Sequence, residues 1–148
     1  MKTPSPQPSE TPVVLYQTED GTVRVSALVQ DETLWLTQAA MAALFDVAPQ
    51  NITYHLKQVY ESDELREEAT CKEILQVQNE GGRKVSRSRK FYDLDAIIAV
   101  GYRVNSKRAT QFRIWATGVL REYELFNRTQ RIDSDFDKLV RAASRHNP

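Results

Sequence analysis

The stretch Thr37–Tyr60, TQAAMAALFDVAPQNITYHLKQVY, decides the fold because it has the pattern of two short helices joined by a tight turn. Thr37 suits the N-cap of the first helix, and the alanine-rich segment after it has a high helix propensity. Asp46-Val47-Ala48 interrupts the pattern, and Pro49 restarts it because proline is tolerated in the first turn of a helix. Apolar residues at helical spacing then give the second helix a buried face: Ile52, Leu56 and Val59.

The turn between these helices favours a helix-turn-helix. Ala42 is small and lies where the two helices would approach most closely. Asp46 stands where the motif commonly has a left-handed glycine, and aspartate tolerates that conformation better than most residues. Val47 and Ile52 supply apolar contacts between the helices. A plain structural corner has the same outline, so the exposed face of the second helix has to distinguish the two.

That exposed face is polar and holds no acidic residue before Glu61. Gln and Asn can bind adenine in the major groove, Thr and Tyr serve bases or phosphates, and Lys serves phosphates. We therefore expect this helix to read DNA bases. The base-reading candidates are Gln50, Asn51, Thr53 and Tyr54, and the neighbouring phosphate candidates are Thr37 and Lys57.

Upstream of this stretch, two β-branched runs, residues 13–18 and 22–29, flank Glu19-Asp20-Gly21 and predict a β-hairpin. Leu34–Leu36 adds a short third strand. Residues 1–12 hold four prolines among polar residues and are expected to be a disordered leader. They have no apolar segment of the kind that a secretory signal needs.

Downstream, residues 70–78 and 83–92 flank Asn79–Gly82 and predict a second hairpin. The strand RKVSRSRKFY is polar on both faces until Phe91, so it should project into solvent. A projecting basic hairpin after a helix-turn-helix resembles the wing of winged-helix proteins, and its cations would bind phosphates. The alternative is a solubilising edge strand. The phosphate candidates on this hairpin are Arg83, Lys84, Arg87, Arg89 and Lys90.

Two further helices are expected, over residues 95–104 and 106–127. The second has a core stripe that consists of Phe112, Trp115, Ala116, Val119 and Tyr123. Ser106 is the expected N-cap of this helix. Lys107 and Arg108 would oppose its dipole unless a phosphate binds there, so both are phosphate candidates. Residues 128–148 form a tail with a short amphipathic helix around Phe136, Leu139 and Val140.

The charge is unevenly distributed although the whole chain is neutral. Residues 1–80 hold 5 Lys and Arg against 13 Asp and Glu, whereas residues 81–121 hold 10 against 2. Residues 122–148 hold 5 of each. A concentrated positive field matters more to a polyanion than the average of the chain. An ordinary solvated surface with uneven charge is the alternative.

Several classes of protein fit poorly. The only histidines are His55 and His146, and Gly81-Gly82 is not followed by Lys and Ser or Thr, so we expect no enzyme and no phosphate loop. Cys71 stands alone, so we expect no disulfide, metal or other cofactor, and a reducing, cytoplasmic setting. No run approaches the ~18 apolar residues of a membrane span.

Two segments carry a family resemblance: Trp35–Gln38 through Asn51–Leu56, and the longer KFYDLDAIIAVGYRVNSKRATQFRIWAT at residues 90–117. They resemble the virulence RhuM family, which is similar in turn to phage and viral Bro-type N-terminal domains. The resemblance spans roughly residues 13–123. It implies a DNA-binding module of bacterial mobile and defence-associated loci without established catalysis.

Together these features predict an α+β fold with an N-terminal β-hairpin, a helix-turn-helix with a basic hairpin wing, and C-terminal helices on the core. The winged domain would cover residues 13–127. We expect a sequence-specific double-stranded DNA-binding protein that regulates transcription of such a locus, and a homodimer, because such proteins usually read two-fold sites. The alternative is an antitoxin-like interaction module that binds a partner protein through the acidic first half or the tail.

Overall fold

The computed structural model describes residues 12–145, so the expected leader, apart from Pro12, lies outside the described residues. The fold is α+β, as predicted. The chain divides into two compact units, Met1–Ala116 and Thr117–Pro148. The first unit holds the sheet and the packed helices, and the second consists of the continuation of the last helix.

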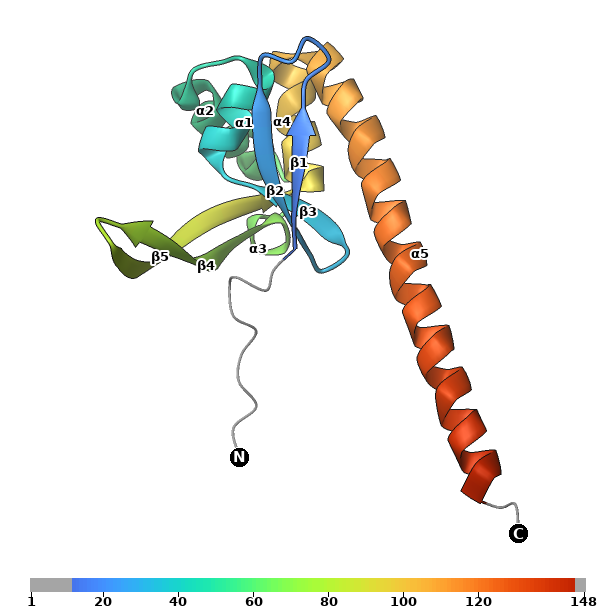
Figure 1. The fold of residues 1–148 in the computed structure, drawn as a ribbon. Helices are drawn as coiled ribbons and strands as arrows, with labels where there is room; N and C mark the ends of the chain where they lie inside the picture. Colours follow the sequence, from blue (N-terminus) through green and yellow to red (C-terminus); the bar gives the residue numbers. More distant parts are fainter. Residues whose placement is uncertain (1–11, 146–148) are drawn as a thin grey trace. The chain divides into compact units, whose positions relative to one another are not determined.

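One five-stranded sheet organises the first unit (Figure 1). Its order is β1-β2-β3-β5-β4, and all neighbouring strands are antiparallel. Gly21 has a φ of 74° in the turn after the first strand, which only glycine adopts without strain. The strands are β1 (Val13–Gln17), β2 (Arg24–Gln30), β3 (Thr33–Leu36), β4 (Cys71–Glu80) and β5 (Arg83–Asp93).

The helices are α1 (Gln38–Phe45), α2 (Pro49–Glu61), α3 (Glu67–Thr70), α4 (Leu94–Val104) and α5 (Ser106–Arg145). Helices α1 and α4 pack on the sheet, and α2 packs on both of them. The start of α5 packs on β1, where the Tyr16 ring lies 5.1 Å from Phe112 and 4.8 Å from Trp115. The largest fully buried side chains come from strands and helices alike: Leu34, Leu36, Met41, Leu44, Phe45, Ile52, Val59, Ile97, Val100 and Phe112.

The turn between α1 and α2 has the predicted conformation. Thr37 caps α1, since its hydroxyl accepts a hydrogen bond from the Ala40 N–H at 3.1 Å. Asp46 adopts the left-handed conformation with φ 56° and ψ 51°. The Val47 N–H then donates to the Ala42 carbonyl at 3.0 Å, and Pro49 is the first residue of α2. Three residues, Asp46 to Ala48, therefore connect the two helices.

The β4–β5 hairpin extends beyond the sheet (Figure 1). Its base is anchored by a cluster of buried apolar side chains: Ile74, Phe91, Leu28 and Trp35. Gly81 and Gly82 form the turn at the tip, with φ of 56° and 80°, as a two-residue hairpin turn of the mirror-image type requires. Past Ile74 no further residue of β4 is buried, so the hairpin leaves the core there.

Helix α5 is longer than the sequence analysis predicted. The expected helix ended near Asn127, but α5 continues to Arg145. Beyond Gly118 the described helix meets no glycine or proline that would stop it, and the Arg128–Glu124 pair, one helical turn apart, supports it. Over residues 12–145, no helix combines the length and the apolar content that a membrane span needs.

Candidate nucleic-acid interface

Helix α2 presents the predicted polar face to solvent. Ile52, Leu56 and Val59 are buried, and Tyr54 is 57% exposed. The His55 ring lies edge-on against Tyr54, with ring centroids 5.1 Å apart, which restricts the tyrosine. All four base-reading candidates lie on the exposed face: Gln50, Asn51, Thr53 and Tyr54.

The two phosphate candidates near α2 differ in availability. The Lys57 ammonium lies 3.9 Å from the Glu61 carboxylate, and both side chains are mostly exposed, so this pair constrains the lysine little. The Thr37 oxygen accepts the capping hydrogen bond of α1, and its hydroxyl proton can still donate to a phosphate. Lys57 is the stronger candidate because its donor is charged.

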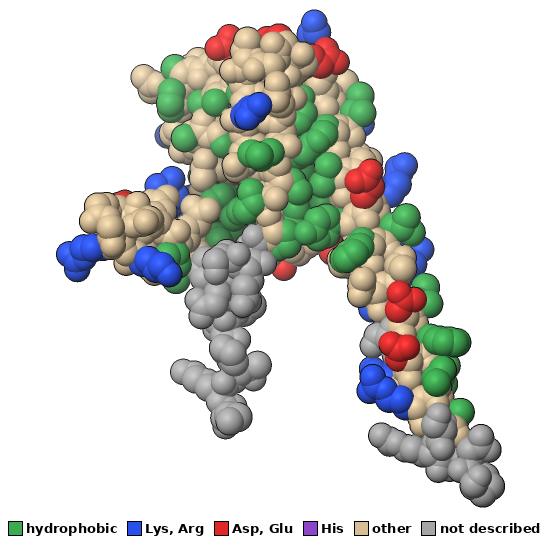
Figure 2. Space-filling view, in the orientation of Figure 1, with side chains coloured by type: hydrophobic (Ala, Val, Ile, Leu, Met, Phe, Trp, Pro, Cys, Tyr) green, Lys and Arg blue, Asp and Glu red, His purple; other side chains and the backbone are tan. Residues whose placement is uncertain are grey.

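The hairpin cations are exposed, as the sequence predicted, and they divide between the two faces of the ribbon. Directly paired residues share a face, and the register Glu80↔Arg83 to Cys71↔Tyr92 fixes the alternation. One face holds the arginines, Arg83, Arg87 and Arg89, and the other holds Lys84 and Lys90. All five are exposed. Figure 2 shows Lys and Arg side chains on this projecting ribbon.

Arg87 is already paired on this surface. Its Nε and Nη2 donate to the two carboxylate oxygens of Glu80, each at 2.8 Å. The guanidinium of Arg87 lowers the pKa of the Glu80 carboxyl below its usual range. A phosphate that binds Arg87 therefore competes with Glu80, whereas the structure gives no such partner for Arg83 or Arg89 among the described residues.

The paired ribbon also carries apolar side chains, contrary to the expectation from β5 alone. Leu75 and Val77 are 49% and 43% exposed. The register places them opposite Ser88 and Ser86, on the lysine face. Neither residue follows from β5 alone, which is polar on both faces until Phe91. The alternation of β4, joined to β5 by a two-residue turn, places both on this face.

The segment from Asn105 to Arg108 forms a structural corner. Asn105 Nδ2 donates to the Phe45 carbonyl at 3.2 Å, and Arg108 Nη1 donates to the Leu44 carbonyl at 3.0 Å. The Val47 and Asp46 N–H groups bind the carbonyls of Ala42 and Ala43. All four terminal carbonyls of α1 are therefore satisfied.

The same corner corrects the expected cap of α5. Asn105, and not Ser106, is the capping residue, because its Oδ1 accepts from the Arg108 N–H at 3.3 Å. The longer asparagine side chain can cap α5 with its oxygen while its amide nitrogen binds α1. Arg108 is only 18% exposed and lies 3.5 Å from Asp20, at the negative end of the α1 dipole.

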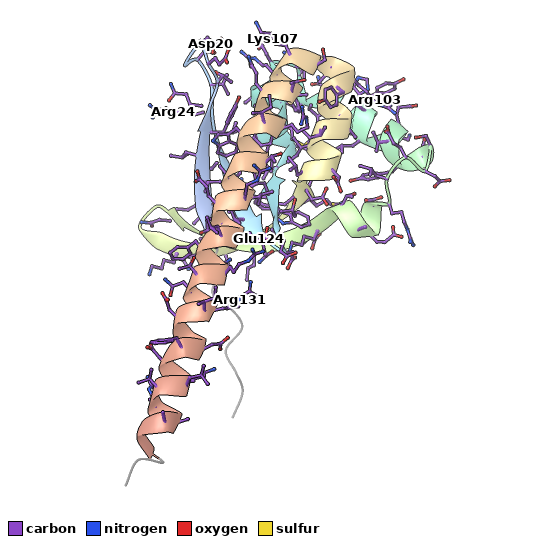
Figure 3. The ribbon with its side chains drawn as sticks, turned by 90° about the vertical axis from the view of Figure 1, so that its right-hand side faces the viewer. Asp20, Arg24, Arg103, Lys107, Glu124 and Arg131 are labelled. Carbon is purple, nitrogen blue, oxygen red and sulfur yellow. The ribbon has the colours of Figure 1, made fainter. Side chains whose placement is uncertain are left out.

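Lys107 is the exposed cation of this corner. Figure 3 shows it at the same end of the unit as Asp20. The two line a shallow depression with Glu19 and Gln111. Hydrogen bonds from Thr18 and Thr22 hold the pKa of Asp20 well below its usual range, so a negative charge stands beside any anion bound there.

No group of three or more His, Cys, Asp or Glu side chains among the described residues could hold a metal ion. Cys71 is half-buried, and burial raises the pKa of its thiol, which keeps it protonated. A protonated thiol is a weak nucleophile. The candidate binding groups on the described surfaces are therefore the polar side chains of α2 and the cations of the hairpin.

The comparison with protein families matches residues 69–139. The family model that matches them is that of the Virulence protein RhuM family. The match supports the family resemblance seen in the sequence, and it covers β4, β5, α4 and α5 as far as Leu139. The exposed basic hairpin thus lies inside the RhuM region, whereas α2 precedes it. No curated protein and no solved structure matches the chain.

Proposed function

We propose that this protein binds double-stranded DNA in a sequence-specific manner, with α1 and α2 as a helix-turn-helix and the β4–β5 hairpin as its wing. The observation that carries the proposal is the set of five exposed cations on a hairpin that extends beyond the sheet. Phosphate contacts of this kind supply most of the non-specific affinity of DNA-binding proteins. The left-handed Asp46 between α1 and α2 supports the helix-turn-helix assignment.

The β4–β5 hairpin and the exposed face of α2 have different roles in this proposal. The hairpin neutralises phosphates, and the amide and hydroxyl side chains of α2 select bases in the major groove. The proposed role is transcriptional regulation of a mobile or defence-associated locus, in the cytoplasm, without catalysis or a cofactor.

The first test measures affinity for DNA selected from a random pool, at several salt concentrations. Removing two phosphate contacts with R83A/R89A should lower the slope of log affinity against log salt by roughly two and weaken binding to all sequences alike. The matched control, R131A/R141A, removes two exposed arginines of α5. Salt-independent binding, or equal losses in both variants, would contradict the proposal.

A second measurement tests base selection by α2. Asn51→Ala should reduce the preference for the selected sequence by about tenfold and leave non-specific binding nearly unchanged, because a bidentate base contact contributes roughly 1–3 kcal/mol of discrimination. Arg83→Ala is the comparison variant, since it should weaken specific and non-specific DNA together. An unchanged preference in Asn51→Ala would remove α2 as the base-reading element.

A protein-interaction module is the second candidate function. The observation that favours it is the set of exposed apolar side chains on α5 beyond Thr117, such as Phe126 and Phe136. Under this alternative the protein would bind a partner protein and show little salt-dependent affinity for DNA.

A further inference from the structure

The second unit exposes a row of large apolar side chains on α5. They are 49–69% exposed: Leu125, Phe126, Ile132, Phe136, Leu139 and Val140. Contiguous exposed apolar surface of this kind marks interaction sites. This surface lies outside the proposed DNA interface.

Four of these six residues, Leu125, Ile132, Phe136 and Leu139, follow a heptad repeat. Leu125, Ile132 and Leu139 are seven residues apart, and the residue four positions after each is Thr129, Phe136 and Ala143. These are the d and a positions of a coiled coil. Figure 3 shows α5 along this stretch, with Glu124 and Arg131 labelled outside the seam.

The single polar member of this seam is satisfied within its own helix. The Thr129 hydroxyl donates to the Leu125 carbonyl at 3.0 Å. Its methyl group is then the part left for packing, and no unpaired donor would be buried by a second helix.

We propose that residues 125–143 pair with the same segment of a second copy of this chain as a parallel, two-stranded coiled coil. At 1.5 Å per residue the seam is about 28 Å long. Its d positions hold leucine and isoleucine, which suit knobs-into-holes packing against the facing helix. The pairing goes beyond DNA binding and does not depend on it.

Charges beside the seam select the second copy and its direction. In a parallel pair, Arg128 at position g faces Asp133 of the second copy at position e, and symmetry makes two such attractive pairs. An antiparallel pair centred on the same seam would bring Asp133 against Asp133 and Asp135 against Asp135, which is repulsive. Arg128 now pairs with Glu124 of its own helix at 3.1 Å, in an exposed contact that is easily exchanged.

The test is sedimentation equilibrium of the full chain without DNA. The wild-type protein should sediment at twice its monomer mass, and Ile132→Glu should sediment as a monomer. The matched control Gln130→Glu adds the same charge at an exposed position on the other side of α5 and should remain dimeric. Because Ile132 is 60% exposed, thermal unfolding of the first unit should be unchanged in the variant.

Three outcomes overturn the proposal: a wild-type monomer, a dimer that Ile132→Glu leaves intact, and a trimer or higher oligomer. The first of these would mean that the apolar face of α5 binds a different protein. Because no DNA is present, loss of the dimer and loss of DNA binding are separate results.

The direction of pairing is tested by disulfide cross-linking in a Cys71→Ser background. Leu125→Cys should form an intermolecular disulfide on mild oxidation, since a parallel pair places position 125 beside its copy. Gln130→Cys, outside the seam, should cross-link poorly. A persistent dimer in which Leu125→Cys does not cross-link would overturn the parallel arrangement.

Discussion

The β4–β5 hairpin and the corner at Asn105–Arg108 both belong to the positively charged stretch of residues 81–121, yet their cations have different roles. Arg87 on the hairpin is 52% exposed and pairs with one carboxylate, whereas Arg108 is 18% exposed and binds a backbone carbonyl of α1. The hairpin is anchored only at its base, while the corner joins α1, α4 and α5. Arginine is therefore a surface charge on the hairpin, whereas at the corner it stabilises the fold.

This difference shows that segmental charge overstates the charge available to a polyanion. Arg108 contributes to the count of ten cations, but its guanidinium stabilises the end of α1. Substitutions in the corner should act on the free energy of unfolding, and substitutions on the hairpin should act on affinity for DNA.

The largest effect is expected from Gly101→Ala in α4. A Cβ at this position would lie 2.5 Å from Phe45 Cζ and 2.8 Å from Ala109 Cβ. Overpacking of this kind costs about 3 kcal/mol, although alanine favours helix formation over glycine by about 1 kcal/mol. Urea denaturation should therefore show a net loss of stability of about 2 kcal/mol.

The control for that variant is Gly118→Ala in α5, where a Cβ meets nothing within 4 Å. It should leave stability unchanged or raise it slightly. If both substitutions stabilise the protein, the close packing of α4 against Phe45 is incorrect.

A smaller loss is expected from Arg108→Ala. The change leaves the Leu44 carbonyl without its side-chain donor and removes the contact with Asp20. We expect a loss of about 1 kcal/mol, at the lower end of the cost of an unsatisfied carbonyl, whereas the neighbouring Lys107→Ala should change stability by less than about 0.5 kcal/mol. Thermal unfolding of the two variants separates them, and equal effects would contradict the structural role of Arg108.

The smallest effect concerns Glu80→Gln on the hairpin. Freeing Arg87 from its carboxylate partner should raise affinity for DNA roughly two- to threefold, since exposed ion pairs are weak. Glu73→Gln removes the same charge from β4 without releasing Arg87 and serves as the control. Fluorescence anisotropy with a fixed duplex measures the affinity of both variants. An equal rise in affinity would mean that the lost negative charge, and not the release of Arg87, strengthens binding.

Local patterns predicted most of the fold. Asp20-Gly21 and Gly81-Gly82 between β-branched or alternating runs located both hairpins, and Thr37, Asp46 and Pro49 located the ends of α1 and the start of α2. These features act over a few residues, so the sequence shows them directly. The exposed face of α2 followed from the buried stripe at helical spacing for the same reason.

Contacts between distant segments were not predictable in this way. Asn105 and Arg108 bind carbonyls about sixty residues earlier in the chain, and nothing in either segment alone indicates that pairing. The Glu80–Arg87 pair could have been found, because the Gly81-Gly82 turn places both on one face. The heptad of α5 was not predicted because the helix was expected to end near Asn127, a turn after the core stripe.

In the proposed DNA complex, the length of the hairpin beyond its anchor sets how far the protein reaches along a duplex. Six residues of β4 follow the buried Ile74 before the turn, and at about 3.4 Å each they extend roughly 20 Å. Successive base pairs are spaced about 3.4 Å along each strand of DNA, so the ribbon covers the rise of about six base pairs. A protected footprint should accordingly extend about half a helical turn past the bases that α2 contacts, and shortening the ribbon at its tip should shorten that footprint in proportion.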